Sequence, residues 1–196
     1  MAYAPLVGTD ETNTQAYPVD FETAHTQGIP HRAVHLEITN ARAEFFVWQR
    51  HDGRLEIPGG HVDWLSQEQR PESYEAAALR ETIEELNLLV TWQVSVTEAR
   101  ARLHGHLRRI GPLVINQLPS PQGHNNEWVA VFVLAWQGSW GDPCQFVLSE
   151  EGHTAPRWLS LTAVQQQSRQ HPMGINAALQ LFLQRRGILI PLGPRR

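Results

Sequence analysis

Four charged side chains lie within six positions of one another near the middle of the chain: Arg80, Glu81, Glu84 and Glu85. If this stretch is a helix, its 3.6 residues per turn place the three glutamates within an arc of roughly 100°. Carboxylates about 6 Å apart repel each other by roughly 3 kcal/mol per pair at an effective dielectric near 20, and a bound cation would relieve this repulsion. Carboxylate oxygens suit Mg²⁺ or Mn²⁺, which take further ligands from water and substrate phosphates. The spacing therefore predicts a divalent-cation site.

An acidic stripe on a helix can also be a solvated face that binds nothing. Basic residues four positions away would support that alternative, but the residue four positions before Glu85 is Glu81. A Pro-Gly-Gly turn lies upstream, at Pro58–Gly60, and it further favours a binding site over a solvated face.

The stretch from Glu72 to Leu86 predicts the helix that positions these carboxylates. It contains no Pro or Gly and includes three consecutive alanines, which are good helix formers. Pro71 suits the first turn, where its missing N–H is no loss, and Asn87 suits a left-handed cap after the last turn. Opposite the glutamates, the helix carries an apolar stripe for core packing that consists of Ala76, Leu79, Ile83 and Leu86.

The whole stretch from Leu55 to Leu88 resembles the signature of the Nudix hydrolases, in which a glycine precedes a glutamate, an Arg-Glu pair and a Glu-Glu pair at fixed spacing. The matching residues are Gly60, Glu72, Arg80, Glu81, Glu84, Glu85 and Leu88. The leading segment Leu55–Gly60 is also typical of that family. The chain is therefore identified as a member of the Nudix hydrolases.

Three positions depart from the family pattern. Eleven residues rather than five separate Gly60 from Glu72, so residues 64–69 look like an insertion. Thr82 stands where an aliphatic residue is usual, and Asn87 where glycine is usual. Asparagine tolerates the left-handed conformation, so that change is mild, and no departure removes a carboxylate.

The resemblance implies Mg²⁺-dependent hydrolysis of a diphosphate linkage in a nucleoside diphosphate derivative or a similar compound. A further glutamate from a later strand often joins the metal site or acts as the base in this family, and Glu127 is our candidate for it, with Glu151 a weaker one. The expected metal ligands are Gly60, Glu81, Glu84, Glu85 and Glu127, with Mn²⁺ as the other suitable ion. The expected catalytic residues are Arg80, Glu84, Glu85 and Glu127.

Two other functions stay open. Some Nudix domains bind nucleotides or diphosphates without catalysis, but those often lose signature carboxylates, which this chain keeps. The entry segment Gly28–His35 resembles Nudix domains close to isopentenyl diphosphate isomerase. The bacterial isomerases use a cysteine directly before a Gly-His pair, whereas Gly59 precedes Gly60-His61 here, so we place hydrolysis ahead of isomerisation.

Histidines near the signature are a separate question. His31, His35 and His61 could be metal ligands, but no short metal-binding motif joins them. We therefore interpret each of them as a structural histidine.

The resemblance implies an α/β protein with the Nudix fold, a mixed β-sheet sandwiched between α-helices. We expect an N-terminal extension over residues 1–28 and a single Nudix domain over residues 29–196. Hydrophobic patterning predicts strands over residues 31–39, 44–50, 88–96, 112–118 and 127–136, and helices over residues 20–27, 97–109, 163–170 and 175–186. Residues 157–161 resemble the final strand of the family. Residues 119–126, rich in turn formers, are expected to form a loop.

Composition limits the partners. The formal net charge of -4 argues against a general nucleic-acid binder, which would usually be basic. Cys144 is the only cysteine, so an internal disulfide is impossible. Since there is no signal peptide and no long apolar run, we expect no membrane partner and a cytoplasmic location. The expected partner is a small-molecule diphosphate substrate, and a homodimer stays open.

Overall fold

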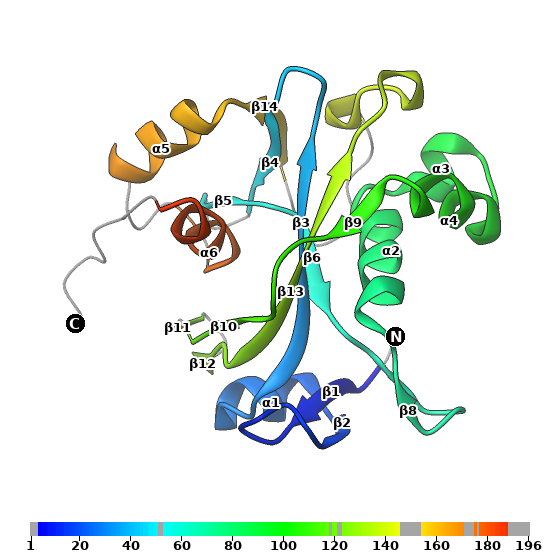
Figure 1. Cartoon of the computed structure of the whole chain (residues 1–196), viewed down its shortest axis with the longest axis vertical. Coiled ribbons are helices and arrows are strands. Elements are labelled where there is room, and N and C mark those ends of the chain that lie inside the picture. Colours follow the sequence, from blue (N-terminus) through cyan, green and yellow to red (C-terminus); the bar gives the residue numbers. More distant parts are fainter. Residues whose placement is uncertain are drawn as a thin grey trace.

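A central β-sheet with helices against both of its faces forms the body of the protein in this computed structural model (Figure 1). The structure describes residues 4–50, 53–117, 119–120, 123–145, 154–170, 175 and 177–187. Helices α2, α3 and α4 lie on one side of the sheet, and α5 and α6 lie on the other. The expected mixed sheet between helices is confirmed.

The main sheet is mixed because its two longest strands, β3 (His31–Thr39) and β13 (Glu127–Ala135), run parallel while its other pairs are antiparallel. Its path is β10-β13-β3-β1-β2, and the remaining strands attach to β3, β4 and β13. The other strands of this sheet are β1 (Leu6–Thr9), β2 (Ala16–Val19), β4 (Phe45–Gln49), β5 (Leu55–Glu56), β6 (Gly59–His61), β9 (Leu107–Arg109), β10 (Val114–Asn116) and β14 (Thr154–Leu159). Two small hairpins complete the strands, β7 (Trp64–Leu65) with β8 (Arg70–Pro71), and β11 (Pro119–Ser120) with β12 (Gly123–His124).

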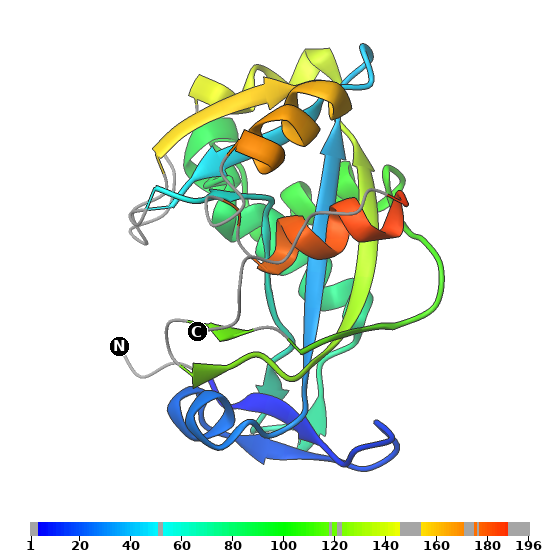
Figure 2. The same cartoon turned by 90° about the vertical axis from the view of Figure 1, so that its left-hand side faces the viewer.

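Six α-helices and two 3₁₀ helices occur in the described residues. They are α1 (Phe21–Gln27), α2 (Tyr74–Glu85), α3 (Leu88–Trp92), α4 (Val96–His104), η1 (Gly138–Trp140), η2 (Pro143–Gln145), α5 (Leu161–Gln170) and α6 (Ala177–Arg185). None of these helices is long and apolar enough to cross a membrane. Figure 2 shows α1, β1 and β2, which come from the predicted N-terminal extension, at the opposite end of the molecule from α5.

The alternation predicted for residues 31–39 decides how the core is divided. Val34, Leu36 and Ile38 are fully buried on the face of the sheet that packs against α2. Ala33 lies on the opposite face, in a cluster that includes Leu181 of α6. The central strand is therefore covered on both faces. Its contacts with α2 set the position of this helix beside β3 and β6.

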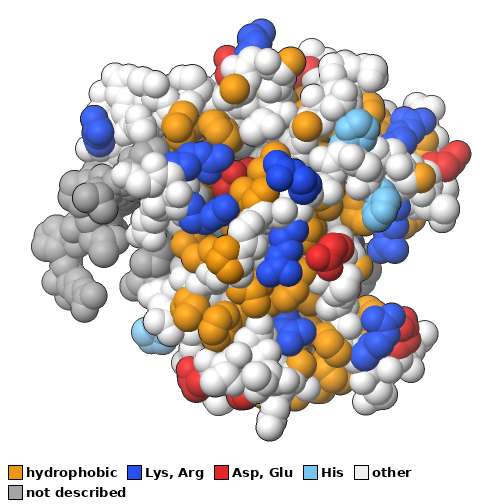
Figure 3. Space-filling view, viewed as in Figure 1, with side chains coloured by type: hydrophobic (Ala, Val, Ile, Leu, Met, Phe, Trp, Pro, Cys, Tyr) orange, Lys and Arg blue, Asp and Glu red, His pale blue; other side chains and the backbone are white. Residues whose placement is uncertain are grey.

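The first turn of α2 contacts three strands of the sheet through Tyr74. Figure 3 shows one face of the molecule, on which basic side chains lie between apolar ones. The guanidinium groups of Arg32 and Arg109 lie over the ring of Tyr74, at 5.7 and 5.8 Å from its centroid. The hydroxyl of Tyr74 donates to the carbonyl oxygen of Trp128, at 3.3 Å. These contacts join α2 to β3, β9 and β13.

The strand predicted over residues 88–96 is wrong, because this segment forms α3. Asn87 and Gln93 flank the helix in the left-handed conformation, with φ of 47° and 53°. Leu88 is fully buried and Leu89 and Trp92 pack against the same core, whereas Val90 is 66% exposed. This burial follows the helical period, so packing overrides the strand preference of the valine and tryptophan residues.

The helix predicted over residues 97–109 is too long and begins too late. The side chain of Ser95, rather than Thr97, caps α4 and makes a reciprocal capping box with Glu98. The helix ends at His104, with Gly105 as its C-cap, and the following Leu107–Arg109 forms strand β9, which pairs with β13. After the helix has ended, residues 107–109 therefore form backbone hydrogen bonds with β13 instead of continuing the helix.

The inserted segment 64–69 begins with β7, which pairs with β8 directly after the insertion. The expected loop over residues 119–126 contains the short hairpin of β11 and β12. The signature helix also starts later than expected. Ser73 is its cap and accepts a hydrogen bond from the Ala76 N–H at 3.1 Å. Pro71 therefore belongs to β8 rather than to the first helical turn, and Glu72 lies before the helix.

Candidate active site

Arg80 is the centre of the polar network on α2. Its guanidinium donates to Glu81 at 2.8 Å and to Glu84 at 3.0 Å. It also donates to the carboxylate of Glu72 at 3.1 Å and to the carbonyl oxygen of His61 at 2.7 Å. One side chain thus connects two helix carboxylates, the residue before the helix cap and the backbone of β6.

The charges around Arg80 keep it protonated. Burial by itself lowers the pKa of Arg80, but the carboxylates of Glu81, Glu72 and Asp63 outweigh burial and raise that pKa above its ordinary value. A fixed positive charge in the middle of the acidic stripe reduces the repulsion between the carboxylates. The i,i+4 contact from Arg80 to Glu84 also gives this helix one basic partner at helical spacing.

Gly60 lies directly against the Glu81 carboxylate, so that a Cβ atom at position 60 would occupy the space of the Glu81 carboxyl group. Strand β6 is held in this position by antiparallel pairing with β3, in which Gly60 faces Val34. A Cβ at Gly59 would in turn approach the carbonyl oxygen of Val34 at 2.5 Å. The two glycines therefore allow the chain to pass between the central strand and α2.

Glu81 is a buried carboxyl that lacks full charge compensation. Burial raises its pKa to about 7, the Arg80 charge opposes this shift, and the Glu84 carboxylate adds to it. Burial therefore favours the neutral form of Glu81 more than in an exposed glutamate. A cation at this position would favour its ionised form.

The three signature glutamates differ in exposure. Glu81 and Glu85 are 7% and 8% exposed, whereas the side chain of Glu84 is 57% exposed. The alternative of a solvated acidic face therefore does not fit Glu81 and Glu85, and Glu84 is the member of the set that solvent reaches. Three oxygen-donor side chains within one and a half turns of α2, beside the backbone of Gly60, suit a hard divalent cation.

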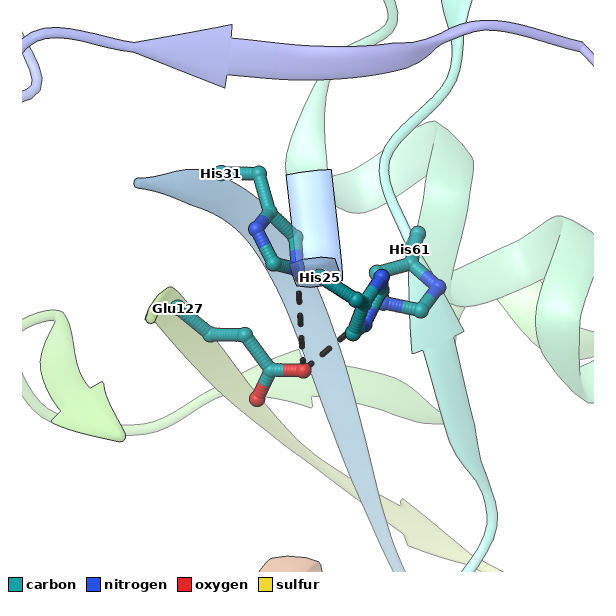
Figure 4. A group of neighbouring side chains, drawn as sticks. All are labelled: His25, His31, His61 and Glu127. Carbon is teal, nitrogen blue, oxygen red and sulfur yellow. Dashed lines mark ion pairs between the residues drawn. The ribbon is translucent and has the colours of Figure 1, made fainter. Parts of the chain in front are cut away.

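Glu127 lies among histidines (Figure 4). Its Oε1 atom is 3.8 Å from His31 Nε2 and 3.7 Å from His61 Nε2. His25 completes a group in which one ligand atom from each residue lies within 4.8 Å of the others. Among the described residues this is the group of three or more metal-binding side chains that meets that distance, and Glu81, Glu84 and Glu85 are not part of it.

The protonation states in this group follow from burial and from mutual charge. Burial lowers the pKa of His31 to about 4 and also lowers the pKa of His25. Burial by itself raises the pKa of Glu127, but His61, His35 and His31 outweigh burial and lower that pKa to about 2. At neutral pH the carboxylate is therefore ionised, and His25 and His31 are neutral.

The sequence interpretation did not include His25. The sequence offers one feature that could have indicated a role for His25. Two histidines, His25 and His31, lie on either side of the predicted helix end at Gly28. His35 is also buried, and burial lowers its pKa. Glu151, the weaker candidate for the extra carboxylate, lies outside the described residues.

Cys144 does not offer a reactive thiol. Burial and the neighbouring Asp142 raise its pKa to about 12. It lies on η2, which packs against β14. A thiolate is the reactive form of cysteine, so this residue gives no support to the chemistry of the bacterial isomerases.

Comparison with known proteins shows the family of this chain. The model of the NUDIX domain matches residues 29–177, which is most of the chain. The chain belongs to the Nudix family. As a Nudix domain that retains its signature carboxylates, it is a Nudix-type pyrophosphohydrolase, an enzyme of a family that generally uses divalent metals.

This chain is similar to several solved structures, of which the first one described here shares its fold. DR0079 from Deinococcus radiodurans is 18% identical, with a TM-score of 0.59 over 92% of this chain and 97% of that protein. A MutT protein from Methanosarcina mazei is 20% identical, with a TM-score of 0.49 over 80% of this chain and 91% of its own. An Ap4A hydrolase from C. elegans is also 20% identical, with a TM-score of 0.47 over 80% of this chain and 97% of its own. No curated protein sequence matches this chain significantly.

Proposed function

We propose that this Nudix domain hydrolyses a diphosphate linkage in a nucleoside diphosphate derivative or a similar compound, with Mg²⁺ as its cofactor. The observation that carries the proposal is the group of carboxylates from Glu81, Glu84 and Glu85 on α2, beside Gly60 and bridged in part by Arg80. Oxygen donors of this kind favour Mg²⁺, with Mn²⁺ as the alternative ion.

The signature residues have different roles in binding the cation. Glu81 and Glu85 are the buried carboxylates that would hold the cation, together with Glu84 and the backbone carbonyl of Gly60. A divalent cation held there would neutralise charge on the phosphoryl oxygens and would acidify the attacking water. Arg80 is a positioning residue, because it holds Glu81 and Glu84 at fixed distances from the backbone of β6.

We assign the general base to Glu84. This carboxylate is the exposed member of the set, so a water molecule and a substrate can reach it. Glu127 was the other candidate for the base and for a cation ligand, and its role there stays a prediction. Its side chain is paired with histidines, which favours Glu84 for the proton transfer.

The test is release of phosphate or nucleotide from a panel of nucleoside triphosphates, dinucleoside polyphosphates and nucleotide sugars. Wild type, Glu85→Gln and Glu75→Gln are compared with and without Mg²⁺. Glu75 is exposed in the first turn of the same helix, so its variant is the matched control. We expect the Glu85→Gln change to lower turnover by about 100-fold or more, equivalent to about 2.7 kcal/mol of transition-state stabilisation.

Two outcomes would contradict the proposal. Equal turnover by Glu85→Gln at saturating Mg²⁺ would remove Glu85 from the cation site. Tight nucleotide binding by the folded wild type without turnover of any compound would favour the non-catalytic binding module instead.

A further inference from the structure

Two arginines on different strands approach the same aromatic ring at the first turn of α2. The guanidinium groups of Arg32 on β3 and Arg109 on β9 lie 5.7 and 5.8 Å from the centroid of the Tyr74 ring. Figure 3 shows basic side chains among apolar ones on the side of the molecule where β9 is an edge of the sheet. We propose that Arg32 and Arg109, held against Tyr74, form a binding site for a small phosphate anion such as inorganic phosphate or diphosphate. This two-arginine site is separate from the carboxylates on α2.

The register of the sheet puts both arginines on one face. Arg32 is paired with Trp128 across β3 and β13, and Arg109 is paired with Phe132 across β9 and β13. Trp128 and Phe132 are four positions apart on β13, so both pairs lie on the same face of the sheet. Phe132 packs in the core cluster that includes alanines of α2, which identifies this face as the α2 side. The two arginine side chains therefore reach Tyr74 from the two strands that flank β13.

Neither of these arginines is neutralised by a carboxylate within the described structure. The arginines that form ion pairs with carboxylates there are Arg42, Arg50, Arg70, Arg80, Arg185 and Arg186. Tyr74 is the first residue of α2, so both guanidinium groups also lie beside the positive end of the helix dipole. The result is a local excess of positive charge that an anion would compensate.

A chain of hydrogen bonds holds Arg32 in place. Its Nε donates to Asn13 Oδ1 at 2.7 Å, and Asn13 Nδ2 donates to the Tyr74 hydroxyl at 3.4 Å. That hydroxyl in turn donates to the carbonyl oxygen of Trp128 at 3.3 Å. Among the described residues, Nε is the only nitrogen of the Arg32 guanidinium that makes a hydrogen bond. The two terminal nitrogens are therefore oriented and available, and this pair of parallel donors is the part of arginine that binds phosphate oxygens.

The predicted N-terminal extension supplies the residue that orients Arg32. Asn13 lies in the turn between β1 and β2 with a φ of 57°, a left-handed conformation that asparagine tolerates. The Asp10 carboxylate accepts hydrogen bonds from the N–H groups of Thr14 and Gln15 at 2.7 and 3.1 Å, which fixes this turn. The two-arginine site therefore joins the extension to β3, β9 and α2.

The charge and spacing of the two guanidinium groups suit a phosphate better than a carboxylate. Their carbon atoms cannot be further apart than the sum of their distances to the Tyr74 centroid, about 11.5 Å. Hydrogen bonds of about 2.8 Å from both groups to one phosphate need the carbons roughly 8 Å apart, and the exposed Arg109 can rotate to reach this distance. A terminal phosphate offers about −1.5 to −2 charges and three oxygens to two arginines, whereas a carboxylate offers one charge and two oxygens. The net charge of -4 favours a small anion over a nucleic-acid strand.

The two-arginine site needs no metal ion. Seven positions separate Tyr74 from Glu81, which corresponds to about 10.5 Å along the helix. The carboxylates of Glu81, Glu84 and Glu85 repel a phosphate unless a cation lies between them, whereas arginines bind it directly. Phosphate binding in the presence of a chelator therefore separates this site from the proposed cation site.

The test measures binding to the full chain with a chelator present, by titration calorimetry and by NMR shifts of backbone amides. The probes are inorganic phosphate, diphosphate and a short single-stranded oligonucleotide. The variants are Arg109→Gln and Arg32→Gln, with Glu85→Gln as the control for the cation site. The matched control is Arg108→Gln, because Arg108 is exposed on the same strand but pairs with Val133, so its side chain points to the other face of the sheet.

We expect the wild type to bind phosphate or diphosphate with the chelator present. Arg109→Gln and Arg32→Gln should each weaken this binding by about 10-fold or more, because each removes charge-assisted hydrogen bonds to the anion. Arg108→Gln and Glu85→Gln should bind within about twofold of wild type, because solvent and salt screen more distant charges. Circular dichroism checks folding, and if Arg32→Gln fails to fold, the exposed Arg109→Gln decides.

Four results would overturn this site. They are folded wild type that binds neither phosphate nor diphosphate, affinity lowered no more by Arg109→Gln than by Arg108→Gln, binding lost in Glu85→Gln, and an oligonucleotide bound more tightly than diphosphate. The last result would assign this surface to nucleic acid instead. Because binding is measured without metal and without turnover, the result is independent of the proposed hydrolysis.

Discussion

Replacing Glu81 with glutamine should make the metal-free protein more stable at high pH. The pKa of Glu81 is raised from 4.5 to about 7, chiefly by burial. Below pH 4.5 both the folded and the unfolded chains hold the proton, so this group costs nothing. Between pH 4.5 and 7 the unfolded chain has lost the proton while the folded chain still holds it, and stability falls as pH rises. Glutamine is neutral at every pH and removes this dependence.

The size of the effect follows from the shift in pKa. One pKa unit corresponds to about 1.36 kcal/mol, so a shift from 4.5 to about 7 corresponds to about 3 kcal/mol at full ionisation. The side chain is 10% exposed, so solvent screening reduces this value little. Between pH 5 and pH 8 the free energy of unfolding of Glu81→Gln should therefore rise by about 2–3 kcal/mol relative to wild type.

The assay is urea unfolding at pH 5, 6, 7 and 8 with a chelator present. The matched control is Glu84→Gln, because Glu84 contacts the same arginine from an exposed position. Its stability relative to wild type should change much less with pH. A Glu81→Gln difference that stays constant from pH 5 to pH 8 would refute the reasoning, since it would mean that the buried carboxyl ionises normally.

Three further changes test single contacts, one at the site and two elsewhere in the fold. Gly60→Ala should destabilise the fold by about 1–3 kcal/mol and lower Mg²⁺-dependent turnover, because the new methyl group meets the carboxylate of Glu81; unchanged unfolding curves and turnover would contradict this contact. Glu37→Gln should cost about 2 kcal/mol or more in calorimetry, because this fully buried carboxylate binds two arginines at the end of α6 that remain partly exposed; an unshifted melting temperature would show that these ion pairs contribute little. Ser95→Ala should lower the free energy of unfolding by about 1 kcal/mol through loss of the α4 capping box, and a loss no larger than that of an exposed serine elsewhere would argue against the cap.

Local patterns predicted the elements that carry their own signals. The strand over residues 31–39 matches β3 in both bounds, because alternation and complete burial reinforce each other there. Asp20 caps α1 through a hydrogen bond from the Thr23 N–H, as expected from a helix that begins near this residue. The signature placed Arg80 beside the carboxylates, and the observed contacts to Glu81 and Glu84 agree with that placement.

Tertiary packing decided what the sequence could not predict. Residues 88–92 have strand propensity, but Leu88 reaches the core only when the chain turns as a helix after Asn87. The neighbours of Glu127 depend on the parallel register of β13 against β3, which no local pattern encodes. His25 joins them only because α1 packs over that end of the sheet.

The long parallel pair of β3 and β13 also has a consequence for how the chain folds. These strands pair along their full length although the signature helix and α4 lie between them in the sequence. A ribosome therefore releases β3, with its buried valine, leucine and isoleucine side chains, well before the partner that covers its edge. Pairing of this non-local kind is slow because a long loop must close first. During synthesis β3 is thus the segment most exposed to aggregation, and a chain truncated before residue 127 should depend on chaperones to stay in solution.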